Sequence, residues 1–260
     1  MINYTINVSD LEYFLLVLTR ISMFISVAPL YGQRGIPNRV KIGFSFFVAV
    51  LIYGTIPDKT PLDYNTVWGY AAIVLREGMT GLLIGFAANM ATTIVAFAGR
   101  IIDMETGMSM ANLVDPTTHQ QESISGVLYQ YVITLILIIT GLHRYLITAL
   151  AQTFILIPIN KAVFDSTKLL DSIVTFLNDY IMLGFRICLP VFAVMLLLNA
   201  ILGIMTKLAP QMNMFSVGMQ LKVLVGLSTL FITVGMLPIV GDMISGEIRK
   251  MMVIFVNAMT

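Results

Sequence analysis

Long apolar blocks, separated by short polar segments, make up most of this 260-residue chain. Hydrophobic residues account for 58% of it and charged residues for only 11%, and its mean hydropathy is +0.90. Soluble domains carry about 25% charged residues, so this chain has too few ionised side chains to cover a water-exposed surface. Blocks of about 20 apolar residues are long enough to cross a bilayer as helices. The sequence therefore predicts an all-α membrane protein.

Seven apolar blocks are expected to form helices, and proline closes several of them. The two shortest blocks fall below the ~20 residues of a simple span, which favours hairpin arms or helices buried against protein. Pro190 lies inside a block, where it removes a backbone hydrogen bond and is expected to kink the helix. Segments 167–180 and 244–255 place apolar residues on one face and are expected to be amphipathic helices. The seven blocks are 11–30, 42–56, 70–97, 124–141, 145–159, 181–205 and 223–240.

Composition and motifs exclude several classes of function. A formal net charge of +1 provides no basic surface for nucleic acid. The single cysteine, Cys188, leaves no disulfide framework and no cysteine metal site. His119 and His143 lack a nucleophile partner and metal-ligand spacing, and no protease, esterase or nucleotide-binding motif is present. We expect no enzyme activity, no cofactor and no bound metal.

Four charged residues stand inside apolar blocks or at their edges: Arg20, Arg76, Glu77 and Arg186. A charge at the bilayer centre costs roughly 2.5–3.5 kcal/mol, so such residues normally face a protein interior or a water-filled path. Neighbouring side chains point about 100° apart on a helix, so Arg76 and Glu77 are expected to pair with other elements and not with each other. The four residues are candidates for buried or intersubunit charges. The alternative is that they sit near helix ends and reach water.

A polar segment, 99–121, interrupts the apolar blocks near the middle of the chain. Methionine is unbranched and polarisable and can repack around changing neighbours, and glycine permits unusual backbone angles. Such a segment can close a hole and later leave it. The alternative is an ordinary loop whose methionines pack on neighbouring helices. Its distinctive residues are Met104, Gly107, Met108, Met110, Asp115 and Pro116.

Short motifs in a constant order extend over nearly the whole chain. They are Arg20 with Ala28-Pro29; GIPNRVKIG from Gly35; Arg76-Glu77 with Gly81 and Gly85; Gly107-Met108-Ser109 leading to Asp115-Pro116; and LAPQMN from Leu208 with FSVG from Phe215. Together they resemble the FliR family, whose members are export-gate subunits of flagellar and virulence type III secretion. The flagellar branch is the better match.

The resemblance implies tilted helical hairpins with broken helices that assemble with FliP and FliQ around a central pore. Unfolded export substrates cross that pore, with FlhA and FlhB beneath it, in the inner membrane at the flagellar basal body. Residues 1–180 correspond to a FliP-like portion with a plug loop at about 99–123. Residues 181–260 correspond to a FliQ-like hairpin followed by the C-terminal amphipathic helix.

The resemblance also assigns two groups of site residues. The plug is Thr106, Gly107, Met108, Ser109, Met110, Ala111, Asn112, Leu113, Val114, Asp115 and Pro116. Its apolar members are expected to form a dry stopper, with Gly107 and the Asp-Pro pair as hinges. The cytoplasmic loop of the second hairpin contains Lys207, Pro210, Gln211, Asn213, Phe215, Gly218 and Lys222.

Two other functions remain open at the level of sequence. A small-solute secondary transporter with discontinuous helices needs a midplane polar site, and the only hint of one is a proline spacing that recurs near both ends. A structural assembly factor without a pore-lining part is the third alternative. Purification with FliP and FliQ separates the export gate from the transporter, and removal of the Met-rich loop separates it from the assembly factor.

Overall fold

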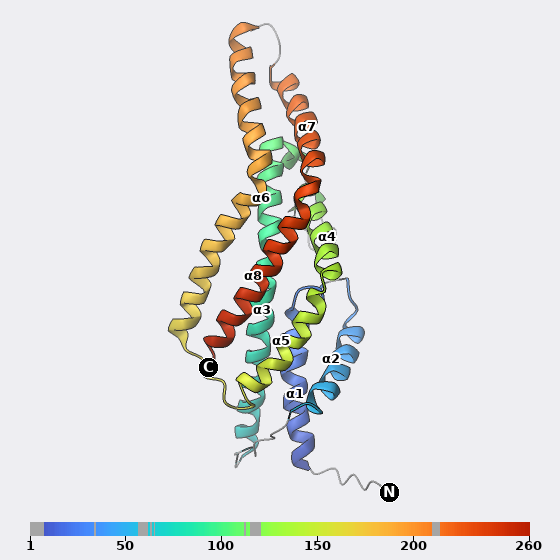
Figure 1. The fold of residues 1–260 in the computed structure, drawn as a ribbon, viewed down its shortest axis with the longest axis vertical. Coiled ribbons are helices and arrows are strands. Elements are labelled where there is room, and N and C mark those ends of the chain that lie inside the picture. Colours follow the sequence, from blue (N-terminus) through green and yellow to red (C-terminus); the bar gives the residue numbers. More distant parts are fainter. Residues whose placement is uncertain are drawn as a thin grey trace. The chain divides into compact units, whose positions relative to one another are not determined.

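The computed structural model describes residues 8–33, 35–56, 62, 64, 66–111, 113–114, 121–209 and 214–260 (Figure 1). These residues are almost entirely helical, which confirms the predicted all-α fold. The only extended structure among them is an antiparallel pair of two-residue strands, β1 (Leu113–Val114) and β2 (Gln121–Glu122). The α-helices are α1 (Val8–Val27), α2 (Asn38–Tyr53), α3 (Val67–Thr106), α4 (Ile124–Ile139), α5 (Leu142–Leu156), α6 (Ser166–Leu208), α7 (Met214–Thr233) and α8 (Leu237–Asn257), with short 3-10 helices η1 (Met108–Ala111) and η2 (Val234–Met236).

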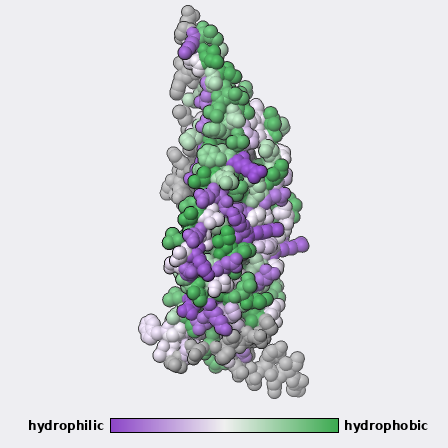
Figure 2. Space-filling model, turned by 60° about the vertical axis from the view of Figure 1, so that its left-hand side comes forward, coloured by the Kyte–Doolittle hydropathy of each residue, from purple (hydrophilic) through white to green (hydrophobic). Residues whose placement is uncertain are grey.

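Three stretches of the described chain are long and apolar enough to cross a membrane: Val67–Thr106, Ser166–Leu208 and Val217–Asn257. The number rises to four if α4 and α5 together form one interrupted span. Figure 2 shows one face of the protein, on which hydrophobic residues lie at the surface among hydrophilic ones. Exposed apolar side chains are unfavourable in water but suit lipid or partner helices. The prediction of a membrane protein is confirmed.

Three helix boundaries differ from those predicted. Helix α3 continues to Thr106, because the polar residues after position 97 are good enough helix formers to extend it until Gly107. The predicted helices 167–180 and 181–205 form one helix, α6, since no breaker separates them, and Pro190 lies within it. Pro238 is one of the prolines expected to close an apolar block. It lies instead in the first turn of α8, where its missing N–H has no helical partner to lose.

The chain forms two compact units that alternate along the sequence. Unit 1 comprises Met1–Ala91, Gly141–Phe176 and Gly246–Thr260, and unit 2 comprises Thr92–Thr140 and Leu177–Ser245. These units are defined by compactness. The predicted division into residues 1–180 and 181–260 instead rests on likeness to FliP and FliQ, and it stays a prediction.

In unit 1, α1 and α3 touch backbone to backbone. A Cβ atom added to Gly81 would overlap the carbonyl oxygen of Arg20, and one added to Gly85 would lie 2.8 Å from the carbonyl oxygen of Phe24. Small residues at a helix crossing allow this approach, and van der Waals packing drives much of helix association in membranes. Gly81 and Gly85 belong to the motifs of the family resemblance. This close contact explains why these two positions need glycine.

In unit 2, the last turns of α3 are enclosed by other helices. Gly99 packs directly on the backbone of Gly126 in α4, and Phe97 fills the space that Gly184 of α6 leaves open. On α7, a Cβ atom added to Gly226 would lie 2.5 Å from a methyl carbon of Thr106. The end of α3 is therefore held by three helices, immediately before the Met-rich segment begins.

We expect Gly81→Ala to lower the thermal unfolding temperature of the detergent-purified protein. The added methyl group overlaps α1 and forces the two helices apart, at a cost of about 1–3 kcal/mol. The matched control is Gly43→Ala in α2, where an added Cβ meets no described atom within 4 Å and alanine improves helix propensity. Equal unfolding temperatures for the two variants would contradict the close contact.

Candidate functional site

The part of the polar segment that follows α3, residues 107–121, is called the Met-rich segment below. It begins at Gly107, directly after the last residue of α3. Gly107 has φ = +80°, in the left-handed region that favours glycine and commonly ends helices. An added Cβ there would meet no described atom within 4 Å. The chain then forms η1, followed by β1, which pairs with β2 so that Leu113 lies opposite Glu122. The base of the segment is therefore a short hairpin between α3 and α4.

The methionines on the two sides of Gly107 do not share one environment. Met104 is 67% exposed on α3, whereas Met108 is only 8% exposed and Ser109 is exposed. The turn at Gly107 accounts for the difference, because it directs the chain after α3 back towards protein. The remaining residues of the predicted stopper lie outside the residues or side chains that the structure describes, and the stopper stays a prediction; they are Met110, Ala111, Asn112, Leu113, Val114, Asp115 and Pro116.

Both ends of the segment are anchored by polar contacts. On the α3 side, the fully buried Thr106 donates its hydroxyl to the carbonyl oxygen of Ile102 at 2.9 Å. On the α4 side, Ser123 is the N-cap, and its hydroxyl oxygen accepts from the amide of Gly126 at 2.9 Å. A serine cap satisfies one of the free amides at a helix start.

Asp103 joins these two ends, and sequence reasoning did not single it out. Its side chain is 1% exposed and accepts a hydrogen bond from the Ser123 hydroxyl at 2.7 Å. It also accepts from the backbone amide of Ser125 at 3.2 Å. The sequence held one signal for this contact. A carboxylate in the last turn of a helix opposes the negative end of the helix dipole and needs a partner from elsewhere.

A second polar centre lies in unit 1 and contains two of the predicted charges. Arg20 of α1 and Glu77 of α3 are both fully buried, and Arg20 Nη2 lies 2.6 Å from Glu77 Oε2. Arg20 Nε donates to the same oxygen at 2.6 Å. The guanidinium also lies over the ring of Phe154, 4.4 Å from its centroid. Pairing, hydrogen bonding and a cation–π contact together offset the loss of solvation of the charge.

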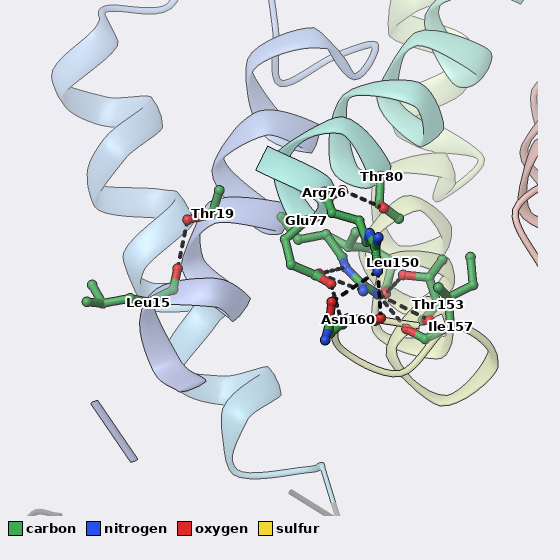
Figure 3. Close-up of polar contacts among 10 residues, drawn as sticks. Leu15, Thr19, Arg76, Glu77, Thr80, Leu150, Thr153, Ile157 and Asn160 are labelled. Atoms are coloured by element: carbon green, nitrogen blue, oxygen red, sulfur yellow. Dashed lines mark hydrogen bonds and ion pairs between the residues drawn. The ribbon is translucent and has the colours of Figure 1, made fainter. Parts of the chain in front are cut away.

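The remaining donor capacity of Arg20 is used at the end of α5. Its Nη1 atom donates to the carbonyl oxygen of Ile157 at 2.9 Å and to that of Thr153 at 3.4 Å. The last carbonyls of a helix have no partner within it, and a cation there also suits the helix dipole. Figure 3 shows Thr153, Ile157 and Glu77 grouped around this contact. Arg20 therefore joins α1, α3 and the end of α5.

Asn160 lies just after α5 and is hydrogen-bonded to two residues of α3. Its backbone amide donates to Glu77 Oε1 at 2.9 Å, and Arg76 Nη1 donates to both its carbonyl oxygen and its Oδ1 at 3.1 Å each (Figure 3). Asn160 has φ = +65°, which asparagine tolerates better than most residues. Arg76 and Glu77 pair with other elements, as their spacing on a helix predicts. Nothing in the sequence pattern pointed to Asn160.

The other predicted site residues belong to unit 2. Arg186 is exposed on α6 and lines a cavity of about 270 Å³ together with Tyr129, Pro190 and Thr233. Its predicted role at a subunit contact stays a prediction, as does any contact of Arg20, Arg76 or Glu77 with another chain.

The second hairpin is described only in part. Gly218 of α7 is buried with an added Cβ 3.5 Å from Leu202 of α6, Lys207 is exposed and Lys222 is half-buried. Pro210, Gln211, Asn213 and the side chain of Phe215 lie outside the described part. The cytoplasmic position of this loop stays a prediction. Among the described residues, no group of three His, Cys, Asp or Glu side chains could hold a metal ion.

Residues 11–248 match the family model described as bacterial export proteins, family 1. The flagellar biosynthetic protein FliR of Bacillus subtilis is 32% identical over 229 residues, covering 87% of this chain and 88% of that protein. FliR of Escherichia coli is 29% identical over 217 residues, with 81% and 80% covered. FliR of Aquifex aeolicus is 28% identical over 221 residues, with 85% and 84% covered.

We expect Arg20→Leu and Glu77→Leu each to destabilise the protein by roughly 3–5 kcal/mol, because each leaves the other charge buried without a partner. The double variant is expected to lose much less than the sum, since no uncompensated charge remains. Thermal challenge followed by gel filtration of the purified variants measures the effect. Arg76→Gln, at an exposed position, is the control and is expected to cost about 1 kcal/mol or less. Additive losses from the two single variants would contradict the pairing.

Proposed function

This chain belongs to family 1 of the bacterial export proteins, and from that membership we propose that it is a core membrane subunit of the flagellar type III export gate. It is a membrane protein of the flagellar export apparatus: the relatives are named for flagellar biosynthesis, and its long apolar helices suit a bilayer. We place it in the bacterial inner membrane, within the flagellar basal body.

In this proposal the chain assembles with FliP and FliQ around a central pore that unfolded flagellar export substrates cross, with FlhA and FlhB beneath. The exposed apolar surface supports such an assembly. The most apolar window of α6 is only 22% buried within this chain, which leaves a large surface for partner helices or lipid. Residues 1–180 act as the FliP-like portion and residues 181–260 as the FliQ-like hairpin with the C-terminal helix.

The Met-rich segment is the proposed plug of that pore, and its placement is the observation that carries the proposal. A 40-residue helix ends at Thr106, the 3-10 helix η1 with Met108 and Met110 follows, and the residues on either side, Asp103 of α3 and Ser123 at the start of α4, are hydrogen-bonded to each other. Apolar constrictions stop ions by excluding water, and methionine adapts its shape to changing neighbours. A seal of this kind closes an idle pore and yields to an exported chain. It needs no catalytic step, metal or cofactor.

The alternative of a small-solute secondary transporter has less support. The relatives are named for flagellar biosynthesis. The buried charges of unit 1, Arg20 and Glu77, satisfy each other and nearby backbone groups, so they offer no free polar site to a solute.

We expect FliP and FliQ to co-purify with the affinity-tagged chain through detergent extraction and gel filtration when all three are expressed together. The exposed apolar helices need partners to cover them, which is the physical reason for a stable complex. An unrelated membrane protein with the same tag is the control. A tagged chain that elutes alone would contradict membership of the gate.

We expect deletion of residues 108–113 to make cells leak small ions while the complex still assembles, because the apolar seal is lost. Potassium efflux from cells measures the leak, and gel filtration measures assembly. A finer comparison uses two variants. Cells with Met108→Ser and Met110→Ser together are expected to leak potassium. Cells with Met104→Ser, which changes an exposed methionine on α3, are not expected to leak. Unchanged efflux in the deletion strain would rule out a plug.

A further inference from the structure

We infer that Asp103 is a positioning residue of the gate: its buried carboxylate joins the end of α3 to the start of α4 and keeps this joint closed both at rest and during export. The inference rests on the proposed plug function, because the joint fixes the two points between which the Met-rich segment is held. The residues that carry it are Asp103, Ser123, Ser125 and the glycine pair Gly99 and Gly126.

The carboxylate is fully committed to α4. Asp103 Oδ2 accepts the Ser123 hydroxyl at 2.7 Å, and Oδ1 accepts the Ser125 amide at 3.2 Å. The Ser123 oxygen in turn accepts from Gly126 N at 2.9 Å. Hydrogen bonds to an ionised acceptor are shorter and stronger than those between neutral groups. The first turn of α4 is therefore tied to α3 through a continuous chain of polar contacts.

Helix electrostatics favour the contact of the Asp103 carboxylate with α4. Asp103 lies in the last turn of α3, where the unpaired carbonyls disfavour a negative charge, and faces the first turn of α4, where the free amides favour one. With α4 docked, the carboxylate is satisfied although it is only 1% exposed. With α4 detached, the same charge would remain at the wrong end of α3 without donors. Docking of α4 therefore stabilises the Asp103 carboxylate relative to an arrangement in which α4 is detached.

Packing reinforces the joint on the side away from the Met-rich segment. The backbones of Gly99 and Gly126 are in direct contact, so a side chain at either position would separate α3 from α4. Beyond Thr106 the left-handed backbone of Gly107 ends α3. The described ties between α3 and α4 therefore lie between Gly99 and Thr106 on one side and between Ser123 and Gly126 on the other.

The first test measures potassium efflux from cells that carry the whole export complex. Asp103→Ala is expected to leak while FliP and FliQ still co-purify, because losing a charged hydrogen-bond acceptor raises the open population of the joint roughly ten- to hundredfold. Asp103→Asn keeps one carbonyl oxygen and is expected to leak less. Asp242→Ala removes an exposed carboxylate of the same unit and is the control, expected to stay tight.

Combination with the loop deletion separates the two proposals. If Asp103 acts through the plug, Asp103→Ala adds no leak to a strain that already lacks residues 108–113. Suppose that the deletion strain leaks potassium, whereas the Asp103→Ala strain assembles fully and does not leak. This result would overturn the role of Asp103 and leave the plug proposal intact. A deletion strain that stays tight would overturn the plug, and the role of Asp103 with it.

A second test replaces the hydrogen bond of Asp103 by a covalent bond between α3 and α4. In a Cys188→Ala background, Asp103→Cys with Ser123→Cys places two thiols at the positions whose side chains make the 2.7 Å contact, and diamide is used to join them in a disulfide whose formation is verified by mass spectrometry. We expect the oxidised complex to secrete flagellar export substrates at the rate of the Cys188→Ala parent, since the joint stays closed during export. The single Asp103→Cys variant under diamide is the control. Secretion that stops on oxidation and recovers on reduction would show that the joint has to open, and would overturn the inference.

Discussion

The contact between Arg20 and Glu77 is the constraint on which unit 1 depends. A charge buried in an apolar helix is acceptable only if it is paired and hydrogen-bonded, and the guanidinium reaches Glu77, the carbonyls at the end of α5 and the ring of Phe154 at once. Those partners come from segments far apart in sequence. The positions of α1, α3 and α5 are thereby fixed together, since none of the three can shift without leaving a buried charge unsatisfied.

Asp103 solves the same physical problem in unit 2 with the opposite sign. Arg20 donates to carbonyls at the end of one helix, and Asp103 accepts from the Ser125 amide at the start of another. In a bilayer the backbone groups at a helix end have no water to bind, so an ionised side chain that reaches them is worth more than at a soluble surface. Glycine contacts next to both centres, at Gly81 and at Gly99, bring the helices close together where these side chains meet their partners.

Hydropathy predicted the class of fold, the approximate helices and which charges are unusual, because the energetic cost of a charge in an apolar block is a local property of the sequence. It did not predict their partners. Asn160 lies 83 residues from Glu77, and no periodicity connects them. The predicted helix end at position 97 was wrong for a related reason. A drop in hydropathy marks a change of environment, whereas a helix continues until the backbone itself is interrupted, as Gly107 interrupts α3.

The family match extends over most of the chain, but the mechanism depends on a few contacts within it. A plug must be held firmly enough to seal and loosely enough to yield, and these demands conflict if one element has to meet both. The described contacts separate them: polar ties and glycine packing secure the helix ends at Thr106 and Ser123, and none of them involves the methionines. In the proposed mechanism, the described ties between α3 and α4 come from Asp103, Ser123 and the glycine pair, so a change at Met108 leaves those ties in place.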